Sequence, residues 1–179
     1  MRGKVGLMAA AVVLPGMAAP AAALTEEQAE CVARAAPAGF AARLASVMLS
    51  GQASPPEKEA LMRQLATISE ACAEMTGIPA DRRQAYFDYW QARIPRDELS
   101  RQLVAAGIPL EPIDDILDLG PGRSNPEIQG VTDGQAALIS AALKARGVAV
   151  DRVGDETWNK VGGYIAGTSL MFQRLRALP

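Results

Sequence analysis

From residue 24 onward, almost every segment of the sequence has the apolar spacing of an amphipathic helix and ends at a glycine or a proline. Side chains three or four positions apart share one face of a helix, so this spacing marks helices that bury one stripe. Proline ends a helix because it lacks an N–H and its ring clashes, and glycine permits the left-handed closing turn. The pattern predicts an all-α domain of about six to eight short helices.

Capping sequences and stops set the boundaries of the expected helices. Residues 25–28 (Thr-Glu-Glu-Gln) form a capping-box sequence, and residues 54–57 (Ser-Pro-Pro-Glu) combine an N-cap residue with proline in the first turn. Pro95 is expected to separate a helix over 81–93 from one that opens at Asp97. Residues 148–153 are expected to be extended, and the remaining helices to cover 40–50, 55–76, 111–119, 132–146 and 155–178.

Residues 1–23 have the layout of a cleaved secretory signal peptide. Arg2 and Lys4 are followed by an apolar run over residues 5–14 and then by a small-residue stretch. The apolar run is about half of the roughly 20 residues that a membrane-spanning helix needs, which favours cleavage over anchoring. We expect cleavage after Ala23, with Ala21 as the alternative, and a periplasmic or secreted product that does not span the membrane.

The chain has two cysteines, Cys31 and Cys72. Export would place both thiols in an oxidising compartment, where such a pair forms a disulfide. Cys72 lies on the apolar stripe of its expected helix beside Ile68 and Met75, so its sulfur should face the core. We therefore predict a disulfide between Cys31 and Cys72 that closes the N-terminal part of the domain.

A loop rich in glycine and proline, residues 120–131, divides the mature chain into a larger part, 24–119, and a smaller one, 132–179. Fewer than roughly 50 residues bury too little surface to fold alone, so the smaller part is expected to pack on the larger one. Trp158, Ile165 and Phe172 are the side chains expected at this contact.

The last expected helix contains Gly162, Gly163 and Gly167. Glycine inside a helix costs on the order of 1 kcal/mol relative to alanine. Two explanations are open: the helix breaks at Gly162, or another backbone approaches the glycines closely.

The charge balance makes a nucleic-acid partner unexpected. The leader contains two of the 18 basic residues and none of the 20 acidic ones, so its removal leaves a net charge of −4. A mildly acidic chain without a basic patch does not attract phosphates.

The sequence contains no histidine. This excludes Ser-His-Asp and Cys-His catalytic systems and zinc sites that contain histidine. Carboxylate chemistry, oxygen-ligated metals and lysine-based catalysis remain, but no Ser-x-x-Lys pattern supports the last of these. We expect no cofactor.

Four acidic residues near the middle of the chain have helical spacing: Glu111, Asp114, Asp115 and Asp118. Carboxylates three and four positions apart can converge on Mg²⁺ or Ca²⁺, and Asp-Asp-x-x-Asp resembles the aspartate-rich motif of isoprenoid synthases. The alternative is a solvated face at the N-terminal end of a helix whose apolar residues point inward. We favour the solvated face and expect no metal site.

Four of the eight aromatic residues fall within one and a half turns of a single expected helix: Tyr86, Phe87, Tyr89 and Trp90. Such a group can stack on a ligand or fill the core. Tyr86, Trp90 and Arg93 share one stripe of the helix, and Phe87, Trp90 and Ile94 share another. Trp90 should therefore be buried whichever stripe faces inward, whereas one tyrosine should stay exposed. Tyr86, Tyr89 and Trp90 are the candidate ligand-binding aromatics.

The segment from about 135 to 165 contains two expected helices with a distinctive set of positions: Ile139, Leu143 and Gly147 in the first, and Gly154, Thr157, Val161 and Tyr164 in the second. With these residues the segment resembles a small peptidoglycan-binding module of cell-wall hydrolases. In that module a helix with a leucine and a closing glycine is followed by a second helix that begins Gly-x-x-Thr and continues Val-x-x-aromatic. The resemblance implies a peptidoglycan partner. It departs from the module at Lys160, where a small residue is usual.

Together these features favour an exported, non-catalytic helical protein of the cell envelope that binds another envelope protein or peptidoglycan. The alternative is a glycan hydrolase that uses carboxylates alone, since glycoside hydrolysis needs only two suitably separated acids. The candidate acids are Glu70, Glu74, Asp88 and Glu156.

Overall fold

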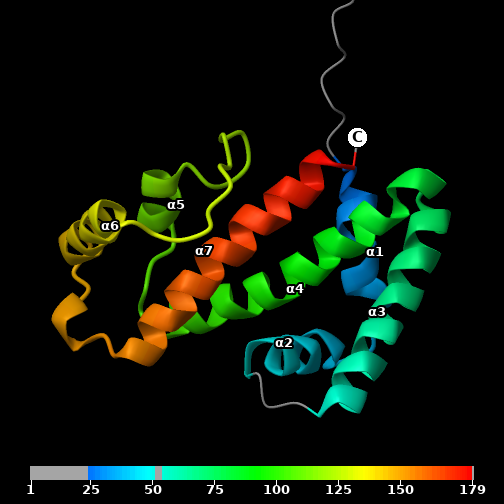
Figure 1. Cartoon of the computed structure of the whole chain (residues 1–179), viewed down its shortest axis with the longest axis horizontal. Coiled ribbons are helices and arrows are strands. Elements are labelled where there is room, and N and C mark those ends of the chain that lie inside the picture. The colour runs from blue at the N-terminus through cyan, green and yellow to red at the C-terminus, as the bar shows by residue number, and fades with distance from the viewer. Residues whose placement is uncertain (1–23, 51–53, 179) are drawn as a thin grey trace, which may run out of the picture.

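The computed structural model describes residues 24–50 and 54–178 (Figure 1). The expected leader, residues 1–23, lies outside the described residues. Within them all regular structure is helical, which confirms the all-α prediction. The seven α-helices are α1 (Glu26–Ala35), α2 (Phe40–Ser50), α3 (Pro55–Met75), α4 (Arg83–Ala105), α5 (Glu111–Leu117), α6 (Asp133–Ala145) and α7 (Asp155–Arg176). None of these described helices is both long enough and apolar enough to cross a membrane.

The capping residues at the helix starts form side-chain hydrogen bonds in α1 and α6 but not in α3. Thr25 and Gln28 form the reciprocal capping box, with the Gln28 N–H donating to Thr25 Oγ1 over 3.2 Å and the Thr25 N–H donating to Gln28 Oε1 over 2.9 Å. Thr132 and Gln135 form the same box at the start of α6. Ser54 precedes α3, but its side chain makes no capping hydrogen bond, so α3 begins with the proline-containing first turn alone.

Helix α4 is continuous through Pro95, and the prediction of two helices separated there was wrong. An interior proline costs about 3 kcal/mol in an isolated helix. Here α4 lies alongside α7 over much of its length (Figure 1), and α4 is buried on both sides of the proline, at Trp90 before it and at Leu99 after it. The ion pair of Arg93 and Asp97, 3.3 Å long, also spans the proline. Tertiary packing of both halves against one partner keeps the helix intact.

Residues 148–153 do not form one extended segment, contrary to expectation. The Val148 N–H donates to the Leu143 carbonyl over 3.1 Å and so closes the end of α6. Val150–Arg152 then form a single 3₁₀ turn, with Val150 at the edge of the core. Since no described strand lies beside this apolar stretch, it has no partner for a β-ladder.

The buried apolar side chains form two core clusters that share α4 and α7. The first cluster joins α1, α2, α3, the first half of α4 and the end of α7. The second joins the other half of α4 with α5, α6 and the first half of α7. Ile165 belongs to the second cluster and Trp158 packs against it, whereas Phe172 packs against the first. In Figure 1 the long helices α4 and α7 accordingly run between the α1–α3 group and the α5–α6 group.

The disulfide is formed as predicted. It joins Cys31 on α1 to Cys72 on α3, with the two Cα atoms 5.8 Å apart and 41 residues apart in sequence. Both cysteines lie in the first core cluster. The bond therefore holds the short first helix against the long α3.

The glycines of α7 mark its contact with α4. The helix does not break at Gly162. A Cβ added to Gly163 would lie 3.0 Å from Leu99 Cδ1, and one added to Gly167 would lie 3.1 Å from Arg96 Cβ. Close approach of α4 therefore explains why glycine occupies these two positions.

Candidate functional site

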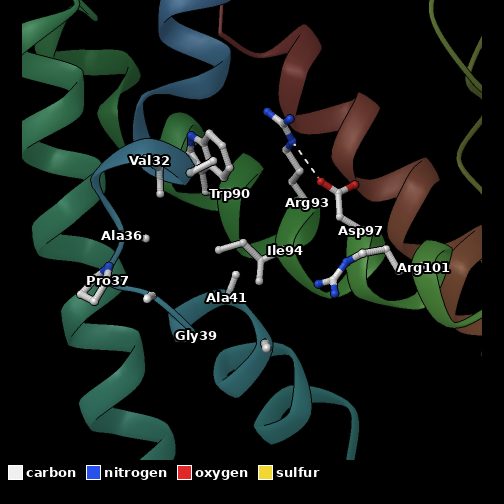
Figure 2. A pocket seen from close by; sticks show the side chains of 13 residues that line it. Val32, Ala36, Pro37, Gly39, Ala41, Trp90, Arg93, Ile94, Asp97 and Arg101 are labelled. Atoms are coloured by element: carbon white, nitrogen blue, oxygen red, sulfur yellow. Dashed lines mark hydrogen bonds and ion pairs between the residues drawn. The ribbon is translucent and has the colours of Figure 1, made fainter.

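A cavity of about 460 Å³ opens between α4 and the corner that joins α1 to α2 (Figure 2). In Figure 2, Trp90 and Ile94 project from α4 toward this corner. The cavity is called the apolar cavity below, because small apolar side chains form most of its wall. Its lining residues are Val32, Ala33, Ala36, Pro37, Ala38, Gly39, Ala41, Ala42, Trp90, Arg93, Ile94, Asp97 and Arg101.

The shape of the apolar cavity follows from the α1–α2 corner. Ala36 leaves the helical conformation, Gly39 takes a φ of 77°, and the Phe40 N–H donates to the Pro37 carbonyl over 3.0 Å. This turn directs Phe40 into the core, where it is 4% exposed. The outward-facing side chains of the corner that line the cavity are small, Pro37 and alanines, which leaves space in front of Trp90.

Arg93 forms the charged edge of the apolar cavity. Its guanidinium lies over the Trp90 ring, 4.7 Å from the ring centre, and pairs with Glu30 over 2.8 Å and with Asp97 over 3.3 Å. It also donates to the Ala29 carbonyl. Burial alone would lower the pKa of Arg93, but the hydrogen bond with Glu30 and the surrounding negative charges raise it above its usual value. Arg93 is thus a fixed, paired cation that supports Trp90.

The structure places the three candidate aromatics differently. Trp90 is 2% exposed and lines the apolar cavity. The expectation that one tyrosine stays exposed was wrong, because both tyrosines are buried with their hydroxyls bonded: Tyr86 donates to the Gln28 carbonyl over 2.6 Å, and Tyr89 accepts from Arg93 over 3.2 Å. Burial raises the pKa of both phenols. Neither tyrosine is among the residues that line the apolar cavity.

A second cavity, of about 520 Å³, lies where α2, α4 and the start of α7 meet. It is called the polar cavity below, because carboxylates, a lysine and amides line it. Its residues are Ala42, Ser46, Leu49, Glu98, Leu99, Gln102, Glu156, Asn159, Lys160 and Gly163. The two cavities adjoin: Ala42 lines both, and the ion pair of Arg101 with Glu98 joins a residue of the apolar cavity to one of the polar cavity.

The carboxylates of the polar cavity are ion-paired. Glu156 pairs with Lys160 over 2.8 Å, and hydrogen bonding to Lys160 holds the pKa of Glu156 below its usual value. Glu98 accepts a hydrogen bond from Gln102 over 2.8 Å and pairs with Arg101. The polar cavity thus combines two anions, the Lys160 ammonium and uncharged polar groups, and Arg101 pairs with Glu98 from the adjoining apolar cavity.

The four acids proposed for a hydrolase do not form one site. Glu70 and Glu74 both pair with Arg83 on the outer side of α3. Asp88 lines a different cavity, and Glu156 lines the polar one. Each has a polar or cationic partner rather than an apolar environment.

Glu98 is the acid that the sequence analysis missed. It shares the polar cavity with Glu156, although the two residues lie on different helices. The sequence predicted a helix that opens at Asp97, which places residue 98 in the first turn of that helix. Acids are common in a first turn because they stabilise the helix N-terminus, so Glu98 gave no signal of a site. The continuous α4 instead directs it into the cavity wall, with its side chain 17% exposed.

The four acids around α5 diverge rather than converge. Glu111 pairs with Arg146 over 2.9 Å, and Asp115 pairs with Arg123. Asp118 ends the helix in the left-handed conformation, with a φ of 53°. No group of three or more potential ligands for a metal ion occurs among the residues described.

Asp114 is an exception to the expected solvated face. It is half-buried, and both its carboxylate oxygens lie 2.9 Å from the Tyr164 hydroxyl, which donates to them. Burial raises the pKa of Asp114, against the opposing effects of Tyr164 and Arg96. The expectation of a fully solvated acidic face was therefore wrong for this residue.

The residues that resemble the peptidoglycan-binding module have mainly packing roles in this fold. Ile139, Leu143, Val161 and Tyr164 are buried in the second core cluster. Lys160, where the sequence departs from the module, lines the polar cavity. Comparison of the chain with protein-family models, with curated proteins and with solved structures found no significant match, so its function has to be inferred from this geometry.

Proposed function

We propose that this protein is an exported, non-catalytic binding protein of the cell envelope, and that its ligand lies in the groove formed by the apolar and polar cavities. The observation that carries the proposal is that the two cavities adjoin at Ala42 and the Glu98–Arg101 ion pair. Each has a volume typical of ligand sites, and together they offer apolar surface at one end and hydrogen-bonding groups at the other. Peptidoglycan or an envelope protein is the partner.

The protonation of the acids supports binding over glycan hydrolysis. A hydrolase needs one carboxylic acid that stays protonated near neutral pH and a second that is ionised. Lys160 keeps Glu156 ionised, and the acid whose pKa burial raises, Asp114, is bound to Tyr164 and lines neither cavity. The acid with the raised pKa therefore lies outside both cavities, which favours binding over hydrolysis.

Export is supported by the leader-like residues 1–23 and by the disulfide, which is typical of oxidising compartments. Expression of the full chain in a bacterium with two membranes should give a periplasmic protein. Intact-mass measurement should show a chain that begins at Leu24 and contains no free thiol. A full-length, reduced protein in the cytoplasm would contradict this part of the proposal.

The binding test uses a variant that fills the groove. Ala42→Phe adds a large side chain where the two cavities meet, and Ala42 is exposed, so folding should not suffer. The matched control is Ala60→Phe on the exposed face of α3, which lines neither cavity. Wild type and control should co-sediment with purified peptidoglycan sacculi or with washed envelope membranes, and Ala42→Phe should lose at least about tenfold in retention.

Equal retention of Ala42→Phe and wild type on every envelope fraction would overturn the groove as the binding site. The same sacculi also test hydrolysis, since the wild type should release no more soluble fragments than a buffer blank. Release that depends on Glu98 and Glu156, and that is lost in Glu98→Gln, would support the hydrolase instead.

A further inference from the structure

The polar cavity is lined by charges from two helices that are distant in sequence. Glu98 comes from α4, where it pairs with Arg101, and Glu156 comes from the first turn of α7, where it pairs with Lys160. The two acids differ in depth: the Glu98 side chain is 17% exposed and the Glu156 side chain 85% exposed. One carboxylate is therefore in the wall and the other at the rim.

Uncharged groups complete the polar cavity. Gln102 and Asn159 contribute amides that both donate and accept hydrogen bonds, and Ser46 contributes a hydroxyl. Leu49 and Leu99 contribute apolar surface. Such a lining suits a small ligand that has charged ends and a hydrogen-bonding body.

We infer that the polar cavity binds a short peptide with a free ammonium and a free carboxylate, with the ammonium facing Glu98 and Glu156 and the carboxylate facing Lys160. This inference rests on the proposed function and specifies its ligand. The lining contains two carboxylates and one ammonium, that of Lys160, because Arg101 lines the apolar cavity only, so a ligand with charge of only one sign would leave one kind of charge in the cavity unmatched. A zwitterion matches both signs, and peptide amides match the side chains of Gln102 and Asn159.

The depth of the two acids explains how a zwitterion would be oriented. A charge-assisted hydrogen bond is stronger where water is partly excluded, as it is at Glu98, so the ammonium gains most beside the wall. Lys160, with 34% of its side chain exposed, can release Glu156 and turn toward a ligand carboxylate without leaving the cavity. Its flexible stem makes this rearrangement inexpensive.

The test uses the oxidised mature protein and trialanine as the probe, with binding followed by isothermal titration calorimetry and by NMR shifts of α4 and α7 amides. N-acetyl-trialanine lacks the ammonium, and trialanine amide lacks the carboxylate. Trialanine should bind, and each analogue should bind about tenfold more weakly, the expected loss for one charge-assisted hydrogen bond.

Variants that remove one charge test where trialanine binds, and a second ion pair of the protein serves as the matched control. Glu156→Gln and Lys160→Gln should each weaken trialanine binding about tenfold. Lys144 and Asp151 form a similar exposed pair, 3.1 Å long, that lines neither cavity. Lys144→Gln and Asp151→Asn should change the affinity by less than about twofold, within the usual range for a distant surface change. Circular dichroism checks that every variant is folded.

Equal binding of trialanine and of the doubly blocked N-acetyl-trialanine amide would overturn the inference, as would unchanged affinity in both cavity variants. Absence of trialanine binding would also overturn it.

Failure of this inference is distinguishable from failure of the proposed function. If Ala42→Phe abolishes envelope retention while trialanine does not bind, the groove still binds a ligand of another class. If Ala42→Phe retains full envelope binding, the proposed function fails whatever trialanine does.

Discussion

Asp114, Tyr164 and Arg96 form a polar chain that connects three helices. Arg96 donates to the Tyr164 hydroxyl over 3.2 Å and stacks on its ring, with the guanidinium 5.1 Å from the ring centre. Tyr164 in turn donates to Asp114 over 2.9 Å. A hydroxyl that accepts from one side chain and donates to another is fully used, so this chain fixes the short α5 to α4 and α7.

The raised pKa of Asp114 predicts a pH dependence of stability. Because burial raises its folded-state pKa, the folded protein binds this proton more tightly than the unfolded chain does. The contribution of Asp114 to the free energy of unfolding is therefore complete below the unfolded pKa, about 3.9, and is lost as the pH rises through the folded pKa. Relative to Asp114→Asn, the wild type should gain stability as the pH falls from 7 to about 4.

Urea unfolding of the wild type and Asp114→Asn at several pH values in this range measures the difference. Glu127→Gln, which changes an exposed carboxylate in the loop before α6, is the control and should show no such trend. A wild-type advantage over Asp114→Asn that shrinks as the pH falls would contradict the predicted sign.

Apart from the disulfide, contacts between single residues were predicted from sequence only where they are local. The Thr25–Gln28 box lies within four residues, and burial of Trp90 follows from either possible stripe. Asp114 and Tyr164 are 50 residues apart, and their bond depends on how α5 meets α7. Periodicity identifies the buried face of each helix but not the helix that it meets.

At the scale of elements, tertiary packing overrides the local conformational preferences of α4 and α7. Pro95 predicts a break and the α7 glycines weaken a helix, yet both helices are continuous over more than 20 residues. The two irregularities lie at the same contact, because Gly167 faces Arg96, the residue after the proline. A bulky residue on α7 would separate the helices where α4 already lacks a hydrogen-bond donor.

The close approach predicts opposite effects for two glycine substitutions in α7. Gly167→Ala should destabilise the protein by about 1–3 kcal/mol, since the new Cβ would lie 3.1 Å from Arg96 Cβ and 3.6 Å from its Cα. Gly162→Ala should stabilise it by up to about 1 kcal/mol, since nothing lies within 4 Å of the new Cβ and alanine favours the helix. Urea unfolding of both variants tests the prediction. Equal effects of the two substitutions would show that α4 and α7 do not meet at Gly167.

At the scale of the whole molecule, helix class and the disulfide were predictable, but the division of the core was not. Composition and spacing determine that a segment is helical, and two cysteines allow a single intramolecular pairing. The sequence suggested a boundary at the glycine-rich loop 120–131, whereas the two core clusters meet along α4 and α7. On α4 the boundary falls between Ile94 and Leu99, where the sequence predicted the end of a helix and not a change of partner within one continuous helix.

This arrangement predicts that loss of the disulfide affects the two clusters unequally. Closing a 41-residue span stabilises a domain by roughly 4 kcal/mol in the chain-entropy model, and both cysteines lie in the first cluster. The double variant Cys31→Ala/Cys72→Ala should therefore melt at a lower temperature, and amides of α1 should exchange fastest because α1 is short and tied to α3 by this bond. Amides of α6 and of the first half of α7, which pack in the second cluster, should keep most of their protection.

Hydrogen exchange read out by mass spectrometry compares the segments in one experiment, with the oxidised wild type as the reference. Uniform loss of protection across both clusters would instead mean that α4 and α7 couple them into one cooperative unit.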